Sequence, residues 1–289
     1  MSLVGTRLIL QDELLKYELH HRARMAIKPG ITGMWQVSGR SDITDFEEVV
    51  RLHTEYISNW NFGLDADEII VLSKGVQDYF RDTYGRETHF IPNGVNRPET
   101  REAGLITEKF GLTKDSYILF LGRLVPEKGI RYLVEAFKDV KTDKKLVIAG
   151  GSSDTDSFMM ELKKLAKDDN RIIFTGFVQG QMLDELYSNA YIYTLPSDLE
   201  GMPLSLLEAM SYGNCCLVSD IPECAEVVED KALIFRKSDV EDLQEKLQDA
   251  CDHPEMVMEM KKHAADFICK KYNWDDVVEE TMKLYRRKQ

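Results

Sequence analysis

Short apolar runs rich in strand-forming residues recur along the chain from about residue 117 onward. They are Tyr117–Leu121, Lys145–Ala149, Arg171–Thr175, Ala190–Leu195, Cys215–Ser219 and Ala232–Phe235. Amphipathic patterns of helical period lie between most of them, for example at Ser157–Ala166 and Met182–Ser188. Strands that alternate with helices favour a parallel sheet. We therefore predict an α/β fold with a Rossmann-like parallel sheet and helices on both faces.

Glycines mark the ends of several predicted strands, where a tight turn or a close ligand leaves no room for a side chain. They are Gly122, Gly150, Gly151 and Gly176. The Gly150-Gly151 pair is not followed by a complete dinucleotide fingerprint, so the pattern argues against an NAD site.

Two cations follow the first predicted strand. Arg123 and Lys128 bracket a turn, and Gly129 then opens a predicted helix. In open α/β sheets, ligands bind beyond the carboxyl ends of the strands, so both cations should stand at the mouth of a site. Arginine offers a planar fork to a phosphate and lysine a mobile point charge. The alternative is ordinary surface pairing with Glu127 or Glu135, which contributes little.

The segment 197–213, SDLEGMPLSLLEAMSYG, places Glu200 and Glu208 on either side of a helix start. Pro203 suits a first helical position, and Gly213 suits the residue just past the helix end. The N-terminus of such a helix can seat a phosphate, and the Glu208 carboxylate can accept from a ribose or sugar hydroxyl. Taken alone, two solvated glutamates are the more common explanation.

The length, net charge and apolar content of the chain limit the number of domains and the kinds of binding partner. The 289 residues allow one or two domains. A formal net charge of −13 argues against nucleic acid or an anionic membrane as the main partner. No run approaches the ~18 apolar residues of a membrane span, and the first residues lack the apolar region of a signal peptide.

The five cysteines, at positions 215, 216, 224, 251 and 269, show no CxxC spacing. We therefore expect a reducing, cytoplasmic location with no disulfide and no zinc site. Asp154 and Asp156 lie in a serine-rich loop before a helix, where helix capping is a better explanation than metal binding.

From about Ala66 onward the chain resembles the C-terminal, nucleotide-sugar-binding domain of a family 4 retaining glycosyltransferase of the GT-B fold. The matching motifs are IPNGVN at 91–96, GRLVPEKG at 122–129, IAGG at 148–151, FTGFV at 174–178, EGMPLSLLEAMSYG at 200–213 and NWDDVVEETMKLY at 273–285. The resemblance implies that residues 113–289 form the donor-binding domain. Residues 65–112 would then be a remnant of the N-terminal acceptor domain, including its last strand–helix–strand unit, followed by the linker.

The resemblance also assigns roles in the site. Arg123 and Lys128, beside Gly122, would hold the diphosphate, and together with Glu200 they would be the catalytic residues. Glu208 would bind the ribose. The donor sugar would face Glu200 and the backbone of Gly201, Met202, Pro203 and Leu204, and the base would lie against the backbone of Phe177 and Val178. The donor would be a nucleotide sugar, UDP- or GDP-linked, with no metal and no other cofactor.

The first 64 residues resemble a different family. MSLVGTR at 1–7, KPGITGMWQVSGRS at 28–41 and residues 45–60 are similar to the C-terminal portion of bacterial sugar transferases, which move a sugar phosphate from a nucleotide to a polyprenyl phosphate. We expect residues 1–64 to form a small mixed α/β remnant. The catalytic carboxylates of that family lie upstream of the matching segments, so Arg7 and Arg40 could contact phosphate without covalent catalysis.

These resemblances imply a retaining glycosyltransferase of capsule or exopolysaccharide synthesis, with a lipid-linked glycan as acceptor. One alternative is a catalytically incomplete fragment of a chimeric protein that binds nucleotide sugar. A less favoured one is an undecaprenyl-phosphate sugar phosphotransferase. The expected location is the cytoplasm, with peripheral association at the inner membrane face and homodimerisation through the N-terminal remnant left open.

Overall fold

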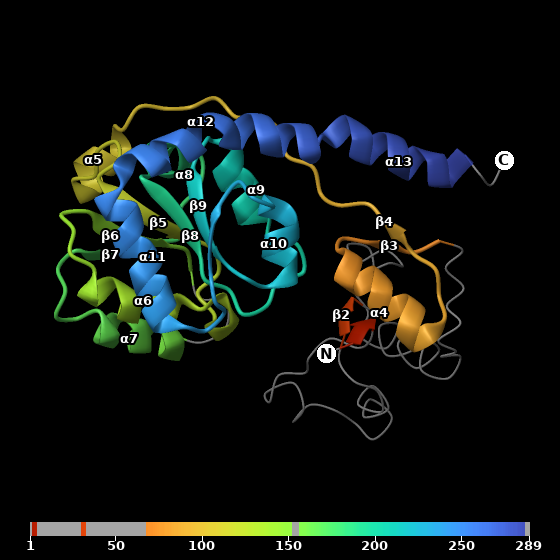
Figure 1. Cartoon of the computed structure of the whole chain (residues 1–289), viewed down its shortest axis with the longest axis horizontal. Coiled ribbons are helices and arrows are strands. Elements are labelled where there is room, and N and C mark those ends of the chain that lie inside the picture. The colour runs from red at the N-terminus through yellow and green to blue at the C-terminus, as the bar shows by residue number, and fades with distance from the viewer. Residues whose placement is uncertain (1, 5–29, 33–67, 152–155, 287–289) are drawn as a thin grey trace, which may run out of the picture. The chain divides into compact units, whose positions relative to one another are not determined.

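The computed structural model describes residues 2–4, 30–32, 68–151 and 156–286 (Figure 1). The chain divides into two compact units, residues 1–67 and 68–289. In the first unit, β1 (Ser2–Val4) pairs in parallel with β2 (Gly30–Thr32). The other predictions for residues 1–64, including the phosphate contacts of Arg7 and Arg40, fall on residues outside the described ranges.

The second unit begins with the predicted strand–helix–strand unit. Strand β3 (Ile70–Val71) and strand β4 (His89–Phe90) pair in parallel, and α4 (Lys74–Tyr84) connects them. The hydroxyl of Ser73 accepts the Val76 N–H at 3.3 Å and so caps the start of α4. The helix stops at Gly85, whose φ of 60° lies in the left-handed region.

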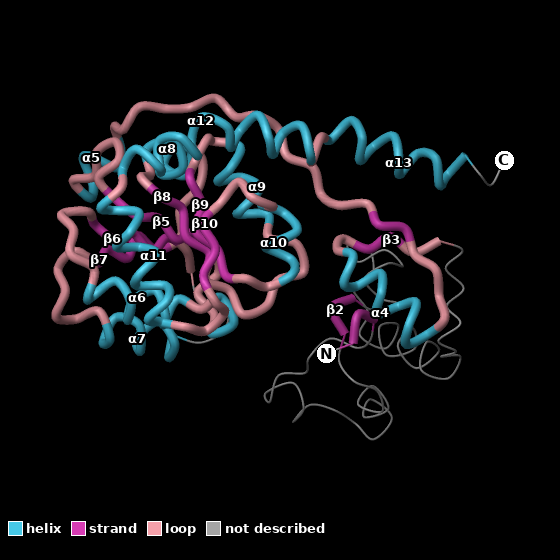
Figure 2. The backbone as a smooth tube through the Cα atoms, viewed as in Figure 1, coloured by secondary structure: helices cyan, strands magenta, loops and turns pink. Residues whose placement is uncertain are grey.

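A six-stranded parallel sheet follows, as predicted (Figure 2). Its strands are β5 (Tyr117–Leu121), β6 (Lys145–Ala149), β7 (Ile172–Gly176), β8 (Ile192–Leu195), β9 (Cys215–Ser219) and β10 (Leu233–Phe235). Three of them have the predicted bounds, and the other three begin one or two residues later than predicted. The positions in β5, β6, β8 and β9 are almost all buried, which explains why continuous apolar runs marked these strands.

Helices cover both faces of the sheet, which confirms the predicted fold class (Figures 1 and 2). Helix α6 packs against α7 and α11 on one face, and α9 packs against α12 on the other. The bounds are α5 (Leu105–Phe110), α6 (Ile130–Asp139), α7 (Asp156–Leu165), α8 (Gln181–Asn189), α9 (Leu204–Ser211), α10 (Pro222–Val228), α11 (Val240–Asp252), α12 (Pro254–Lys271) and α13 (Trp274–Arg286). One turn of 3-10 helix, η2 (Pro126–Lys128), precedes α6.

The strand order is β10-β9-β8-β5-β6-β7. From β5 the chain builds outward through β6 and β7, and it then returns to place β8 on the other side of β5. The order therefore reverses between β5 and β8. In doubly wound sheets the crevice beyond the carboxyl ends of two such strands is where ligands bind. The loop after β5 carries both predicted cations, and the loop after β8 carries Glu200.

All five cysteines are free thiols. Cys215 and Cys216 lie in β9 and are fully buried. Burial raises the pKa of Cys215 to about 12, so the thiol stays protonated and packs as a small apolar group.

A buried carboxylate joins α5 to α8. Glu185 is fully buried and accepts the N–H groups of Gly104 at 2.9 Å and Ile106 at 3.0 Å. The Gln181 amide donates to it at 2.8 Å. Burial by itself would raise the pKa of Glu185, but these hydrogen bonds outweigh it and hold the pKa below the ordinary value.

We expect Glu185→Gln to destabilise the second unit by about 1–3 kcal/mol at pH 7, because an amide cannot accept all of these donors. A carboxyl with a lowered pKa stabilises the fold above its unfolded-state pKa, and that contribution is lost as the pH falls through the folded-state pKa. The difference in unfolding free energy between the two proteins should therefore shrink below about pH 4.3. Urea titrations at pH 7 and pH 4 measure it. The exposed Glu245→Gln serves as a control that should match the unmodified chain at both pH values.

Candidate functional site

Two glycines bring the loops at the strand ends into close contact. Gly129 has a φ of 64°, and a Cβ there would lie 1.9 Å from the Pro196 carbonyl oxygen. Gly150 has a φ of 145°, and its Cβ would lie 1.8 Å from the Gly122 carbonyl oxygen. No larger residue fits either position. The loop after β5 is therefore held against the loops that follow β6 and β8.

Asp198 anchors the loop after β8. Its N–H donates to the Glu127 carbonyl at 2.8 Å, and its carboxylate accepts from the Tyr132 hydroxyl at 3.0 Å and the Ser238 hydroxyl at 2.7 Å. These bonds fix the backbone on either side of Lys128 and just before Glu200, so the two side chains project from a defined frame.

Lys128 and Glu200, two of the predicted catalytic residues, form an ion pair. The Lys128 Nζ donates to Glu200 Oε1 at 2.6 Å, and the Ser197 hydroxyl donates to the same oxygen at 2.6 Å. The Lys128 side chain is 14% exposed and that of Glu200 is 6% exposed. The crossover topology thus joins charges that lie 72 positions apart in the chain. Sequence reasoning placed both residues in the site and missed that they pair.

Arg123, the third predicted catalytic residue, is exposed just past β5. No acidic side chain pairs with it within the part of the chain that the structure describes. Gly122, directly before it, donates its N–H to the Ala149 carbonyl at 3.1 Å, which holds the end of β5 to β6. The Arg123 guanidinium is therefore available to a ligand at this edge of the sheet.

The start of α9 differs from the prediction in one respect. Pro203 precedes the helix, since its ψ of 79° is not helical, and α9 begins at Leu204. The prediction that Pro203 is the first helical residue is therefore wrong by one position. The Pro203 carbonyl accepts the N–H groups of Leu206 at 2.9 Å and Leu207 at 3.2 Å, and the Leu204 N–H turns back to the Met202 carbonyl at 2.9 Å. Three of the first four N–H groups of α9 are thus already used.

An anion at this end of α9 would therefore meet few free N–H donors of the helix. The predicted end of the helix is confirmed, because α9 stops at Ser211 and Gly213 follows with a φ of 82°.

Gly201 and Met202, which were also predicted to face the sugar, differ in how far they are buried. Gly201 is exposed, and a Cβ there would meet no atom within 4 Å. The Met202 side chain is half-buried, and its Sδ accepts the N–H of Asn93 at 3.3 Å. The prediction that the backbone of Met202 faces the donor sugar stays a prediction. Asn93 belongs to the IPNGVN motif, but no sequence signal linked it to Met202.

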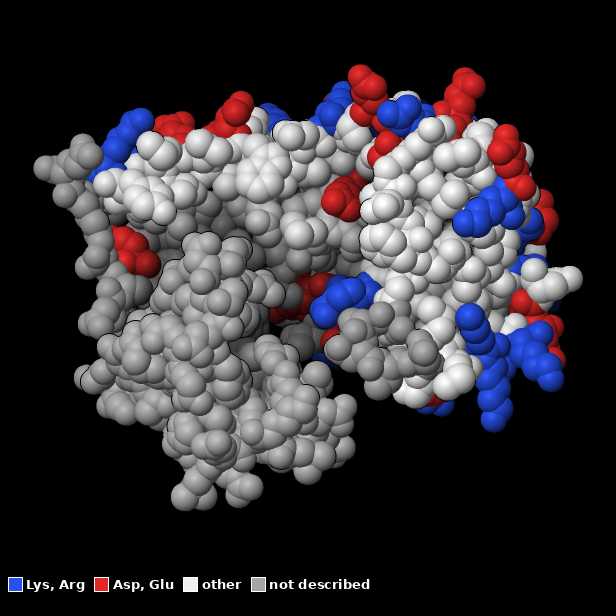
Figure 3. All heavy atoms as spheres, turned by 180° about the vertical axis from the view of Figure 1, so that it is seen from behind, with Lys and Arg blue, Asp and Glu red and all other residues white. Residues whose placement is uncertain are grey.

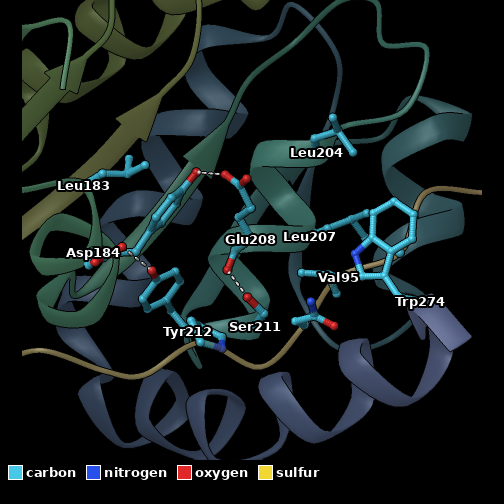
Figure 4. A pocket seen from close by; sticks show the side chains of 13 residues that line it. Val95, Leu183, Asp184, Leu204, Leu207, Glu208, Ser211, Tyr212 and Trp274 are labelled. Atoms are coloured by element: carbon cyan, nitrogen blue, oxygen red, sulfur yellow. Dashed lines mark hydrogen bonds between the residues drawn. The ribbon is translucent and has the colours of Figure 1, made fainter. Parts of the chain in front are cut away.

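The Glu208 carboxylate accepts a hydrogen bond from a buried tyrosine hydroxyl. The Tyr187 Oη donates to Glu208 Oε2 at 3.1 Å (Figure 4). Tyr187 is almost completely buried, and burial raises its pKa well above the ordinary value, so it remains a neutral donor. Tyr212 stacks on Tyr187 with ring centroids 5.2 Å apart, and its hydroxyl donates to Asp184 at 2.8 Å. Tyr187 was missed as a site residue because its partner lies on another helix.

A pocket of about 410 Å³ lies beside Glu208, between α8 and α9 (Figure 4). It is lined by Gly94, Val95, Asn96, Pro98, Leu183, Asp184, Tyr187, Leu204, Leu207, Glu208, Ser211, Tyr212 and Trp274. Lys128, Glu200 and Arg123 do not line it. Of the predicted site residues, only Glu208 and the half-exposed Leu204 are among the lining residues.

The segment predicted to face the base follows β7. Phe177 is 75% exposed, and Val178 is half-buried against the core. The Gly176 carbonyl accepts the Gly150 N–H at 2.9 Å, which ties this segment to the end of β6.

On the face in Figure 3, acidic and basic side chains are intermingled along the edges rather than gathered into a patch of one sign. Among the described residues, no group of three or more His, Cys, Asp or Glu side chains is placed to hold a metal ion. None of the helices described is both long enough and apolar enough to cross a membrane.

The site lies within a segment that matches a known protein family. The family model described as glycosyl transferases group 1 matches residues 105–267, which is more than half of the chain. The chain belongs to the group 1 glycosyl transferases. The matched segment includes Arg123, Lys128, Glu200 and Glu208, and the resemblance found from the motifs is confirmed.

A second model, described as bacterial sugar transferase, matches residues 1–79 and so reaches into α4, past the boundary expected at residue 64. In this part the chain is 49% identical over 76 residues to the galactosyl transferase CpsE of Streptococcus agalactiae. That match covers 26% of this chain and 17% of CpsE.

Longer matches are to glycosyltransferases. An uncharacterized glycosyltransferase of Methanocaldococcus jannaschii is 28% identical over 251 residues, covering 80% of this chain and 62% of that protein. The O-antigen chain mannosyltransferase B of Escherichia coli is 26% identical, covering 63% of this chain and 48% of that protein. This group 1 glycosyl transferase thus spans less than two thirds of each of these relatives.

Solved structures show the same fold. HepE from Anabaena in complex with UDP and glucose superposes with a TM-score of 0.71 at 16% identity, covering 77% of this chain and 64% of that structure. Sucrose-phosphate synthase from Thermosynechococcus elongatus gives a TM-score of 0.69 at 22% identity, covering 91% of this chain and 69% of that one. At these identities the likeness concerns the fold alone.

Proposed function

We propose that the group 1 domain binds a nucleotide sugar, UDP- or GDP-linked, and transfers its sugar with retention at the anomeric carbon in surface-polysaccharide assembly. The observation that carries this proposal is the position of Arg123, Lys128 and Glu200 at the reversal of strand order, beside the start of α9. Cations and a helix dipole at that edge suit a diphosphate.

Chemically, transfer breaks the bond between the anomeric carbon and the diphosphate oxygen and forms a bond from the same carbon to an acceptor hydroxyl oxygen. Negative charge grows on the departing diphosphate, which would take up the proton of the acceptor hydroxyl. Arg123 and Lys128 would stabilise that charge, and the dipole of α9 would add to them. Glu200 would accept hydrogen bonds from the sugar hydroxyls, and Glu208 from the ribose. No metal ion is needed for these roles, because the protein's own cations neutralise the leaving group.

The names of the relatives support this assignment. The Escherichia coli relative is named as an O-antigen chain mannosyltransferase, and the Anabaena structure contains UDP and glucose. The proposal includes a lipid-linked glycan as acceptor, a cytoplasmic location with contact at the inner membrane face, and a homodimer formed through residues 1–64.

The second candidate function is a donor-binding fragment that holds nucleotide sugar without transferring it. The match of residues 1–79 to a different family, bacterial sugar transferase, favours this candidate. The phosphotransferase alternative ranks below it, because the match to group 1 glycosyl transferases covers more of the chain than the match to bacterial sugar transferases does.

A transfer assay distinguishes the transferase from the donor-binding fragment. The chain is incubated with radiolabelled UDP- and GDP-sugars and with lipid-linked glycans from bacterial membranes. Turnover supports the transferase, and NMR of the product shows whether the anomeric configuration is retained. If donor binds without turnover, the fragment assignment holds. If no nucleotide or nucleotide sugar raises the Tm up to millimolar concentration, both are wrong.

Glu208 provides a sharper test of the donor site. We expect the chain to prefer UDP over 2′-deoxy-UDP (or GDP over its deoxy form) by at least about tenfold, since a hydrogen bond to a charged acceptor contributes about 1.5–3 kcal/mol. Glu208→Gln should remove most of that preference while retaining affinity for the deoxy nucleotide. Calorimetric titration measures both, with Glu245→Gln as the matched charge control. An unchanged preference in Glu208→Gln would show that Glu208 does not bind the ribose.

A further inference from the structure

In the ligand-free chain, the counter-ion of Lys128 is Glu200. The two are joined at 2.6 Å, and the hydroxyl of Ser197 donates to the same carboxylate oxygen. A diphosphate bound at this edge would need the same ammonium group. The ligand and Glu200 must therefore compete for Lys128.

The competition is strong because the pair is fixed and largely shielded from water. The two side chains are only 14% and 6% exposed, so solvent screens their attraction less than it would on the surface. Their backbones are held together by the close approach of Gly129 to the Pro196 carbonyl. The Lys128 ammonium therefore lies within reach of Glu200, and an incoming anion must compete with the carboxylate for it.

Glu200 retains one oxygen for a ligand. The hydrogen bonds from Lys128 and Ser197 both end on Oε1, and within the described residues no donor reaches Oε2. A bound sugar carries hydroxyl groups that can donate to a carboxylate and so replace the bond that Glu200 loses when Lys128 turns to phosphate. A free nucleoside diphosphate has no sugar at this position, and it leaves Glu200 with no replacement donor.

We propose that Glu200 selects donor over product by competing with the diphosphate for Lys128. When the nucleotide sugar is bound, the sugar engages Glu200 and Lys128 is free to hold phosphate. When the sugar has left, Glu200 takes Lys128 back and weakens the hold on the nucleoside diphosphate. This inference rests on the proposed function, since it takes the ligand to be a nucleotide sugar.

The test is the affinity ratio between donor and product, measured by calorimetry with UDP, GDP, UDP-glucose and GDP-mannose. The unmodified chain should bind a nucleotide sugar more tightly than the matching diphosphate. Glu200→Gln should bind the diphosphate about three- to tenfold more tightly than the unmodified chain, because the amide competes weakly for Lys128. Its affinity for the nucleotide sugar should not rise to the same extent, so the ratio should fall.

Glu127→Gln is the matched control. Glu127 is exposed and directly precedes Lys128. Its substitution changes the net charge by the same amount as Glu200→Gln and leaves both members of the ion pair in place. Its diphosphate affinity should equal that of the unmodified chain. In a Lys128→Met background, Glu200→Gln should give no gain, which a double-mutant cycle detects.

If Glu200→Gln proves unstable, Glu200→Asp serves instead. It keeps the charge, retracts the carboxylate by one methylene, and should give a smaller gain in the same direction. Diphosphate binding that is unchanged or weaker in both variants would overturn the selection mechanism and leave the proposed function intact. Failure of the unmodified chain to bind any of the four ligands would overturn both.

Discussion

Gly150→Ala is expected to disrupt the loops of the donor site and to abolish nucleotide binding. A Cβ at this position would lie 1.8 Å from the Gly122 carbonyl oxygen, and the φ of 145° is one that side chains rarely adopt. Because the obstacle is backbone, no rotamer change relieves it, and the ends of β5 and β6 must separate. We expect a loss of about 3–5 kcal/mol in unfolding free energy. Guanidinium unfolding measures the loss, and thermal shift with UDP and GDP measures binding.

Gly85→Ala is the matched control for backbone strain. Gly85 has a φ of 60°, and a Cβ there would meet no atom within 4 Å. It should therefore cost only about 1 kcal/mol, the strain of a left-handed alanine, and leave nucleotide binding unchanged. Equal stability of the two variants would show that the close contact between the β5 and β6 loops does not exist.

Lys128→Met is expected to weaken the binding of nucleoside diphosphates and nucleotide sugars by about 100-fold, the effect of losing a charge-assisted hydrogen bond in a shielded site. It should also destabilise the domain by about 1–3 kcal/mol. The buried Glu200 carboxylate loses its counter-ion and keeps the hydrogen bond from the Ser197 hydroxyl. Calorimetry with UDP, GDP and their sugars measures the first effect, and urea unfolding measures the second.

Two comparisons make this prediction specific. Lys163→Met removes an exposed lysine from α7 and should change neither quantity by more than about 0.5 kcal/mol. Lys128→Met/Glu200→Gln should recover much of the lost stability, because the unpaired carboxylate is gone, yet should not recover binding. A Lys128→Met protein that binds diphosphates with undiminished affinity would remove Lys128 from the site.

The sheet could be predicted because its strands are buried on both faces and therefore appear in the sequence as uninterrupted apolar runs. Tyr117–Leu121 and Cys215–Ser219 match their predicted bounds for this reason. The predicted first residue of a strand was less accurate where the apolar run begins before the first residue that pairs with the neighbouring strand. Ala190 and Tyr191 are an example, because β8 begins at Ile192. The sequence indicated that Gly129 and Gly150 mark the boundaries of secondary-structure elements. It did not indicate which backbone carbonyl each glycine approaches.

The candidate residues of the site were predictable from local motifs, and their partners were not. Arg123, Lys128, Glu200 and Glu208 stand in short segments with a recognisable pattern. Pairing of Lys128 with Glu200 depends on β8 returning to the side of β5, and the Tyr187–Glu208 bond depends on α8 packing beside α9. Glu185 resembles any helical glutamate in the sequence, yet it is fully buried and holds the start of α5.

The amino-acid sequence by itself determined the alternation of strands and helices, the group 1 motifs and the types of charge available, because these are local properties of neighbouring residues. The tertiary structure decided which of these charges pair with each other, as Lys128 does with Glu200. Those outcomes depend on strand order and loop contact over many tens of residues, and a pattern of apolar and polar positions contains no information about either.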